Sequence, residues 1–389
     1  MGFFLFDMGL HEKALAHYNH AVELMPSAAI TYLSLAKVQT HLGRLKSALS
    51  TVEKGLTNNP TSARLMVLEA RIRLRLGQVK VATSLTTKAL KQDPGLLGAR
   101  ILRADCALAA GDESSRLRGV TQLLDERNDP TRKLTAIRNH SEALAGRGRI
   151  KAAHALLQQG VNLAVTAGII GSGTRMLTYS ALIERLLGRP QQQLAIADKL
   201  DQLLIAPELS VADRGFAIIY SRSIRAEALF RLGKITQGNA ILNRLEAMAD
   251  GKFFFAKKKD MLAMARGFSL AATGKFDPAD KVVAESASNP CQVLHVRARL
   301  RLQQGNKKAA TSMFDALLNG PNRCANQYGV RAIAYIDALV QRAALSLDAN
   351  QPKDAARRLQ EARKRWSQAD PELSIIKKMQ KLQAQLDTM

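Results

Sequence analysis

The fold is decided by the stretch Gly9-Leu-His-Glu-Lys-Ala14-Leu-Ala-His-Tyr18-Asn-His-Ala21-Val-Glu-Leu-Met-Pro26 and by its return along the chain. Its marker residues recur every 34 residues, as Gly9, Gly43, Gly77 and Gly111 and as Pro26, Pro60 and Pro94. A constant period of this length is typical of repeat proteins, in which each unit packs only against its neighbours. The 389 residues therefore predict a repeat array and not a set of separate globular domains.

One repeat, from Ala29 to Pro60, has the pattern of two helices joined by a tight turn. Gly43 can end the first helix because glycine tolerates the left-handed backbone conformation, and Pro60 ends the second because proline cannot continue a helix. Apolar residues recur at helical spacing on both sides of Gly43. They are Tyr32, Leu35, Ala36 and Leu42, then Leu45, Ala48, Leu49, Val52 and Leu56.

These residues resemble the tetratricopeptide repeat family. Its pattern is a small residue in the first helix, a glycine at the turn, and then Ala, a bulky residue, Ala and Pro along the second helix. The resemblance is strongest over residues 1–111. It implies an all-α fold, a right-handed α-solenoid (superhelix) of about ten helical hairpins.

Beyond Gly111 the intervals vary from 31 to 45 residues, and we predict turns at Gly148, Gly188, Gly233, Gly274, Gly305 and Asn350. Seven residues before each turn stands a small residue. The set is Ala36, Ala70, Ala104, Ser141, Ala181, Ala226, Gly267, Ala298 and Ala343. Five residues after the turn, Arg116 and Gln193 interrupt a second series of small residues, which predicts displaced or irregular second helices there.

The chain is predicted to form one continuous solenoid in three parts. Residues 1–111 are regular repeats with an incomplete first hairpin, residues 112–372 are divergent hairpins, and residues 373–389 form a capping helix with one apolar face. By the period of 34, Gly2 falls at the small-residue position, so the front of the first hairpin is missing. We therefore expect that residues precede Met1, either upstream of an internal coding start or in a longer protein.

The composition is strongly basic, with 57 Lys+Arg against 33 Asp+Glu and a formal charge of +24. Such a field attracts acidic protein segments, nucleic acid or acidic polysaccharide, or it only keeps a solvated surface soluble. Three cysteines fit a reducing compartment, and no apolar run is long enough to span a membrane. We expect a cytoplasmic protein, or a periplasmic one if the N-terminus is truncated.

No motif for catalysis or for a cofactor is present: the sequence has no P-loop, HExxH, GxSxG or dinucleotide fingerprint. We expect no catalytic residue, no cofactor and no metal, with His17, His20 and His41 unligated.

Three local segments carry further expectations. Gly168-Ile-Ile-Gly171-Ser-Gly173 is expected to be an inter-unit loop. Lys252 to Asp260 reads as a loop entering a first helix, or as an aromatic and basic membrane patch. Cys291 and Cys324 are expected to be free thiols, with a disulfide between them as the alternative.

The family resemblance implies that the first helices line a concave groove that holds the ligand. The residues predicted to face it are Lys37, Arg64, Arg71, Arg75, Arg138, Arg175, Arg185, Arg231 and Arg299, against the acidic Asp105, Glu142 and Glu227. Arginine can hold a carboxylate or phosphate with two hydrogen bonds. We therefore predict a non-catalytic scaffold whose basic groove binds an acidic protein or peptide segment. The alternatives are an anion-binding module for nucleic acid or polysaccharide, and the sensor part of a larger enzyme.

Overall fold

The structure is a computed structural model that describes residues 2–7, 11–112, 115, 118–119, 122–123, 129–249, 256–286, 290–320 and 331–389. Every regular element in these ranges is a helix, as the sequence predicts, and no β-strand occurs in them. The chain divides into two compact units, Met1–Ala136 (unit 1) and Ile137–Met389 (unit 2), and the boundary falls inside helix α9. The continuity and the handedness of the predicted solenoid stay predictions.

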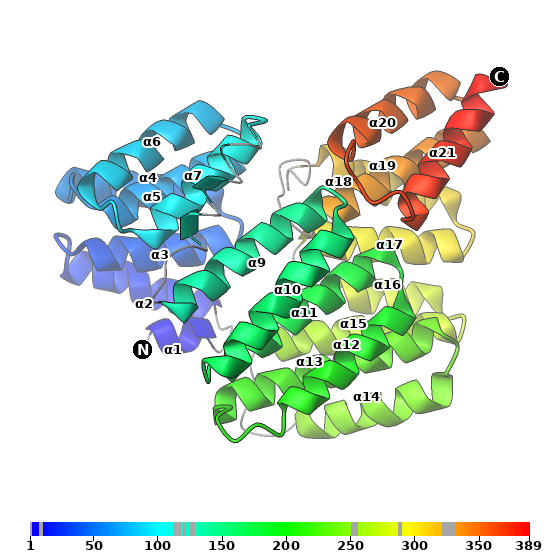
Figure 1. Ribbon diagram of the computed structural model, residues 1–389, viewed down its shortest axis with the longest axis horizontal. Coiled ribbons are helices and arrows are strands. Elements are labelled where there is room, and N and C mark those ends of the chain that lie inside the picture. The colour runs from blue at the N-terminus through cyan, green and yellow to red at the C-terminus, as the bar shows by residue number, and fades with distance from the viewer. Residues whose placement is uncertain are drawn as a thin grey trace. The chain divides into compact units, whose positions relative to one another are not determined.

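Unit 1 is built of helices that follow one another as antiparallel neighbours (Figure 1). They are α1 (Gly2–Asp7), α2 (His11–Leu24), α3 (Ala29–His41), α4 (Leu45–Asn58), α5 (Ala63–Arg75), α6 (Val79–Gln92) and α7 (Leu97–Ala109).

Unit 2 continues the same pattern from the helix α9 (Pro130–Gly146) onward. Its first helices are α11 (Ile170–Leu187), α13 (Val211–Arg231), α15 (Ala256–Ala272), α17 (Pro290–Gln303) and α19 (Arg331–Asp348). The second helices are α10 (Ile150–Thr166), α12 (Pro190–Leu203), α14 (Ile235–Ala249), α16 (Phe276–Ala284), α18 (Lys307–Asn319) and α20 (Pro352–Arg365). The predicted capping helix is α21 (Ser374–Asp387), with Ile375, Met379 and Leu382 buried.

The predicted turns are confirmed by backbone conformation. Every predicted turn residue from Gly43 onward has a positive φ, between 73° and 85° at the eight glycines and 54° at Asn350. In this region a side chain crowds its own backbone, which explains the choice of glycine and asparagine. The predicted turn at Gly9 lies outside the described residues.

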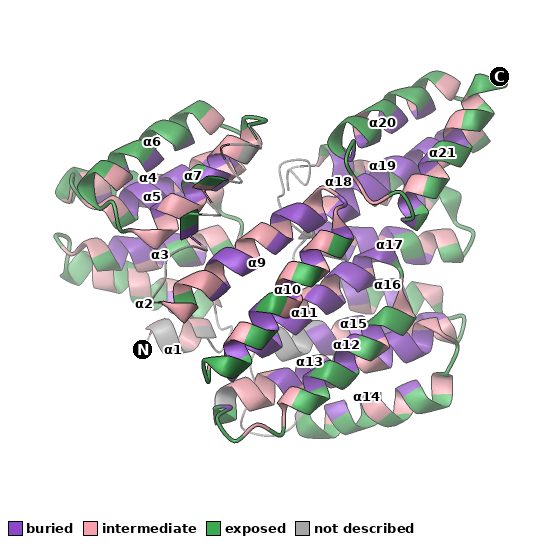
Figure 2. Ribbon diagram, viewed as in Figure 1, coloured by how far each residue is buried: buried purple, intermediate pink, exposed green. Residues whose placement is uncertain are grey.

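The small-residue positions are confirmed by burial. All nine, from Ala36 to Ala343, are buried, and Ala36 and Ala70 have no exposed surface. In unit 1, Ala36 packs within a core of apolar side chains from α3, α4 and α5 that includes Tyr32, Leu65 and Ile72. Figure 2 shows the buried residues concentrated on the sides where helices face one another. Small residues here allow neighbouring helix axes to approach closely.

Ala70→Leu is expected to lower the free energy of unfolding by about 1–3 kcal/mol, because extra methylenes must be forced into a filled core. Urea unfolding followed by circular dichroism measures the change. Ala16→Leu, at an exposed position of α2, is the control and is expected to stay close to wild type. If both variants unfold at the wild-type urea concentration, the repeat register is misplaced.

Two local predictions are wrong. The helix α12 is regular and begins directly after its turn, and the buried Gln193 occupies the small-residue position, where its Oε1 accepts from Arg231 Nη1 at 3.4 Å. The glycine-rich stretch is a loop only at Gly168, because Gly171 and Gly173 lie inside α11. Of the other expectations, those for Arg116 and for residues 252–255 lie outside the described residues.

The cysteine expectation is also wrong in part. Cys291, at the start of α17, is disulfide-bonded and therefore not a free thiol. Cys324 lies outside the described residues, and Cys106 of α7 is free and buried. No helix within the described ranges is long and apolar enough to cross a membrane.

A contact that we call the clasp joins two distant segments of unit 2, residues 146–151 and residues 366–370 (Figure 1). Trp366 Nε1 donates to the carbonyl of Gly146 at 2.9 Å. The Asp370 amide donates to the carbonyl of Gly148 at 3.0 Å, and the Lys151 amide donates to Asp370 Oδ2 at 2.8 Å. Trp366 is buried by these contacts. The turn after α9 is thus tied to the loop between α20 and α21.

Candidate partner-binding site

The nine predicted groove residues divide between the two units, and their surroundings differ. Lys37, Arg64, Arg71 and Arg75 lie in unit 1, and Arg138, Arg175, Arg185, Arg231 and Arg299 lie in unit 2. Whether a cation can serve a ligand depends on whether a carboxylate of the protein already holds it, so each group is described by its partners.

The unit 1 cations are mostly open to solvent. Lys37 of α3 and Arg64 and Arg71 of α5 are exposed, and none of them has a hydrogen bond or ion pair within the described part of the chain. Arg75 is half-buried, and its Nη1 donates to the carbonyl of Thr40 at 3.1 Å. Three of the four predicted side chains are therefore available to an incoming anion.

The repeat places these three side chains on one surface. Arg64 and Arg71 are two helical turns apart on α5, so they share a face of that helix. Lys37 holds the same repeat position as Arg71, and Ile30 holds the same position as Arg64, on the neighbouring helix α3. Ile30 is 59% exposed although it is apolar. We call Ile30, Lys37, Arg64 and Arg71 the unit 1 face.

The unit 2 arginines are paired with carboxylates of the same unit. The distances between ion-pair atoms are 3.9 Å for Arg138–Glu142, 3.0 Å for Arg175–Asp213, 2.6 Å for Arg185–Glu227, 3.6 Å for Arg231–Glu227 and 3.8 Å for Arg299–Asp337. Glu142 and Glu227 are two of the acidic residues that the sequence places on this side. The basic excess predicted for the groove is therefore largely neutralised in unit 2.

Glu227 of α13 lies between two of these arginines and is 1% exposed. Arg231 donates from Nη1 to the carbonyl of Arg185 at 3.1 Å, and its guanidinium stacks over the Phe268 ring at 5.4 Å. Burial lowers the pKa of Arg231, Glu227 raises it, and Arg185 and Arg299 lower it further. The cluster thus links α11 to α13 through ion pairs to a buried carboxylate, and α13 to α15 through the contact between Arg231 and Phe268.

Asp337 of α19 is the centre of a second buried cluster. Its Oδ2 lies 2.7 Å from His295 Nε2, and its Oδ1 accepts from Gln341 Nε2 at 2.9 Å. Burial raises the pKa of Asp337, but Arg299, His295 and Gln341 lower it by more, so the net shift is well downward. On α21, Lys378 donates to Gln341 Oε1 at 2.5 Å. Asp337 is therefore an ionised carboxylate inside the protein.

A serine, a histidine and a glutamate also lie in contact, although sequence reasoning did not single them out. His154 Nδ1 lies 3.3 Å from Ser180 Oγ, and His154 Nε2 lies 2.6 Å from Glu184 Oε1. This order of groups matches that of a nucleophile, a base and an orienting acid. However, Ser180 is buried in the middle of α11, where the backbone amides donate within the helix and cannot stabilise an oxyanion. The contact instead ties α10 to α11.

The histidines near the start of unit 1 have different neighbours from one another. His17 is exposed, His20 Nδ1 lies 3.4 Å from Glu23 Oε2, and the ring of His41 lies against that of His11 with centroids 4.3 Å apart and an angle of 60° between the ring planes. Across the described residues, no group of three or more His, Cys, Asp or Glu side chains is placed to hold a metal ion.

Comparison with known proteins gives low similarity. No family model matches the chain, and no curated protein matches it. Among solved structures, the TPR domain of P58(IPK) is 16% identical, covers 100% of this chain and 96% of that chain, and has a TM-score of 0.26. YrrB, a TPR protein with an unusual peptide-binding site, is 16% identical over 48% of this chain and 91% of that chain, with a TM-score of 0.29.

A tetratricopeptide repeat protein from Parabacteroides merdae is 13% identical, covers 79% of this chain and 95% of that chain, and has a TM-score of 0.32. At such TM-scores the chains do not superpose as wholes. The assignment of tetratricopeptide-type hairpins therefore rests on this chain's own turns, small-residue positions and helix pairs.

Proposed function

We propose that this protein is a non-catalytic interaction scaffold that holds an acidic peptide segment against the unit 1 face. The observation that carries the proposal is the contrast between the units: Lys37, Arg64 and Arg71 are exposed without a partner in the described part of the chain, whereas the predicted groove arginines of unit 2 are paired. An unpaired arginine can bind a carboxylate without first breaking an internal ion pair.

The unit 1 face also offers a contact that a peptide can use beyond charge. Ile30 is 59% exposed and holds on α3 the repeat position that Arg64 holds on α5. An apolar side chain of the ligand can therefore be buried against Ile30 while carboxylates of the ligand meet Arg64 and Arg71. Specific peptide binding depends on such anchors, and charge alone mainly accelerates encounter. The favoured ligand is a segment that combines acidic residues with at least one apolar residue.

Arg71→Glu is expected to weaken binding of such a peptide by at least about tenfold, because it removes a bidentate donor and adds a repulsive charge. The measurement is fluorescence anisotropy of the full chain with peptides from an acidic library, across a salt series. Binding to heparin and to nucleic acid, as generic polyanions, is expected to change little.

Lys88→Glu is the matched control. Lys88 is exposed on α6, the second helix of the hairpin that carries Arg71, and it too has no partner in the described part of the chain. The two variants have the same net charge. Equal loss of peptide binding in both would show that total charge and not the unit 1 face is responsible. Unchanged binding after Arg64→Glu, Arg71→Glu and Lys37→Glu are combined would remove the face from consideration.

A further inference from the structure

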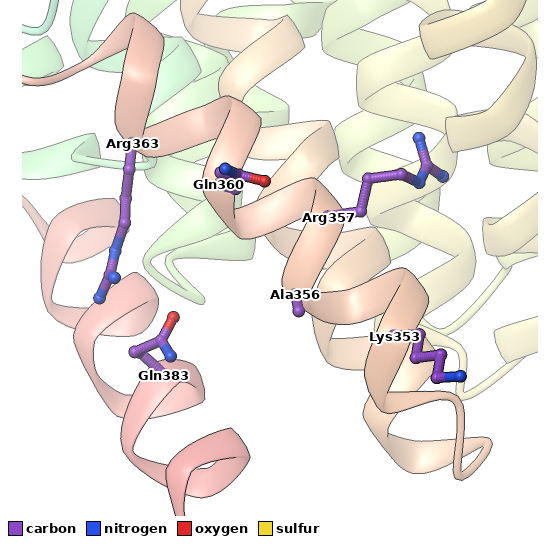
Figure 3. A pocket seen from close by; sticks show the side chains of 6 residues that line it. All are labelled: Lys353, Ala356, Arg357, Gln360, Arg363 and Gln383. Atoms are coloured by element: carbon purple, nitrogen blue, oxygen red, sulfur yellow. The ribbon is translucent and has the colours of Figure 1, made fainter.

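A second exposed cationic surface lies at the end of unit 2, on α20 and α21. A shallow hollow there is lined by Lys353, Ala356, Arg357, Gln360 and Arg363 of α20 and by Gln383 of α21. Figure 3 shows Arg363 extending from α20 toward Gln383, while Lys353 and Arg357 extend from the first half of α20 on the side away from Gln383. Lys364 is exposed next to Arg363. We call this surface the α20 face.

Two features keep the α20 face positive. Lys353, Arg363 and Lys364 are exposed and have no ion pair with any described residue. The acidic residues of α20 are turned to other partners: Asp354 accepts from Arg358 at 2.7 Å and Glu361 accepts from Tyr335 at 2.8 Å. Arg357 also binds Asp354, at 2.5 Å, but its side chain is 64% exposed.

The carboxylate of Asp354 stays ionised in these surroundings. Burial raises its pKa, but hydrogen bonds from Arg358, Ser346 and Arg357 lower it by more, and the net shift is well downward. Because the charge of Asp354 is balanced by Arg357 and Arg358, this carboxylate holds the two arginines in place and does not repel an anion that approaches from the exposed side.

The lining distinguishes this surface from the unit 1 face. Its side chains are cations and amides, and the only apolar one is Ala356, which is too small to anchor a peptide side chain. Arginine, lysine and glutamine are among the side chains that contact phosphate oxygens, and such contacts need no apolar anchor. From residue 353 to residue 364 the helix extends about 16 Å, a length over which duplex DNA presents roughly nine phosphates.

We propose that the α20 face binds nucleic acid through its phosphate backbone, without reading base sequence. This binding is additional to peptide capture by unit 1 and independent of it, since the two surfaces share no residue. A surface of this kind has an affinity that falls steeply with salt, because each neutralised phosphate releases counterions.

The test is the full chain with Lys353→Ala, Arg363→Ala and Lys364→Ala combined, and with labelled duplex and single-stranded DNA of mixed sequence as probes. We expect binding at low salt to weaken about tenfold or more, and the slope of log affinity against log salt to fall by about three units. All three side chains are exposed and unpartnered, so the helical content and the urea midpoint should match wild type.

The control removes the same charge elsewhere: Lys46→Ala, Lys54→Ala and Lys88→Ala, which are exposed on the second helices α4 and α6 of unit 1. A smaller loss than in the α20 variant supports a local site. An equal loss would overturn the proposal in favour of diffuse attraction by the net charge.

Polyglutamate is the competing probe. Tighter binding of polyglutamate than of either DNA would overturn the proposal in favour of an acidic protein, and the absence of DNA binding by the wild type would contradict it outright. Arg71→Glu serves as the second reference, since it should weaken peptide binding and leave DNA binding little changed.

Discussion

Replacing Asp337 by alanine is expected to lower the free energy of unfolding of unit 2 by about 3–5 kcal/mol. The carboxylate is buried, at 4% exposed, and it accepts from Gln341 and lies 2.7 Å from His295. Its loss leaves these buried groups, and the charge of Arg299, without their partner. Urea unfolding followed by circular dichroism gives the size of the effect.

The effect of Asp337→Ala is expected to depend on pH. The pKa of Asp337 lies well below its ordinary value of 3.8, since Arg299, His295 and Gln341 outweigh the effect of burial. A depressed pKa in the folded state contributes stability above the unfolded pKa, and that contribution is lost as the pH falls through the folded value. The difference from wild type should therefore be complete above about pH 4 and shrink below it.

Asp337→Asn separates charge from hydrogen bonding, because asparagine keeps the shape and one acceptor oxygen. We expect it to be destabilised less than Asp337→Ala, and its stability should lose the acid dependence just described. If Asp337→Ala unfolds at the wild-type urea concentration at pH 7, the cluster around Asp337 does not hold α17 to α19.

Gly148→Ala is expected to open the clasp and to cost about 2–5 kcal/mol. Gly148 has a φ of +77°, which strains any other residue by about 1–2 kcal/mol. A Cβ there would also lie 2.5 Å from Ala369 Cβ and 2.9 Å from Trp366 Cδ2, and such overpacking costs about 1–3 kcal/mol. The side chain cannot be accommodated unless residues 366–369 move away.

The experiment has a built-in reporter, because Trp366 is the chain's single tryptophan and is 3% exposed. In Gly148→Ala its fluorescence should shift to the red while the helical content is kept. Gly305→Ala is the matched control: its φ is +82°, but no atom lies within 4 Å of the added Cβ. It should cost only the backbone strain and leave the emission unchanged. Equal emission in the two variants would mean that Gly148 does not support the clasp.

The hairpin pattern could be predicted from sequence because it follows from local chemistry. Gly188 and Asn350 mark turns by what their own backbone tolerates, and Ala181 and Ala343 mark close helix contacts by their size, so spacing alone locates them. Counting residues back from each turn glycine likewise placed the cations of the unit 1 face on two neighbouring helices.

Whether each predicted groove cation is paired with a carboxylate could not be predicted, since in several cases the partner comes from another hairpin. Arg185 meets Glu227 from the next first helix, and Arg299 meets Asp337, 38 positions further along the chain. Gln193 in a small-residue position pointed to an irregular helix, yet the helix is regular and the Gln193 Oε1 accepts a hydrogen bond from Arg231 of the next first helix. Side-chain pairing across repeats is set by tertiary packing, which the spacing of one repeat does not encode.

The clasp also changes how unit 2 can reach its folded state. In an open repeat array every contact is between neighbours, so folding can begin at any hairpin and spread along the chain. Trp366 and Gly146, by contrast, are 220 residues apart in sequence, and their contact closes a loop of that length. The entropic cost of closing this loop becomes small only after the intervening hairpins have folded and shortened the chain. Non-local steps of this kind slow folding. We therefore expect the contact between the first and the last hairpin of unit 2 to form late in folding.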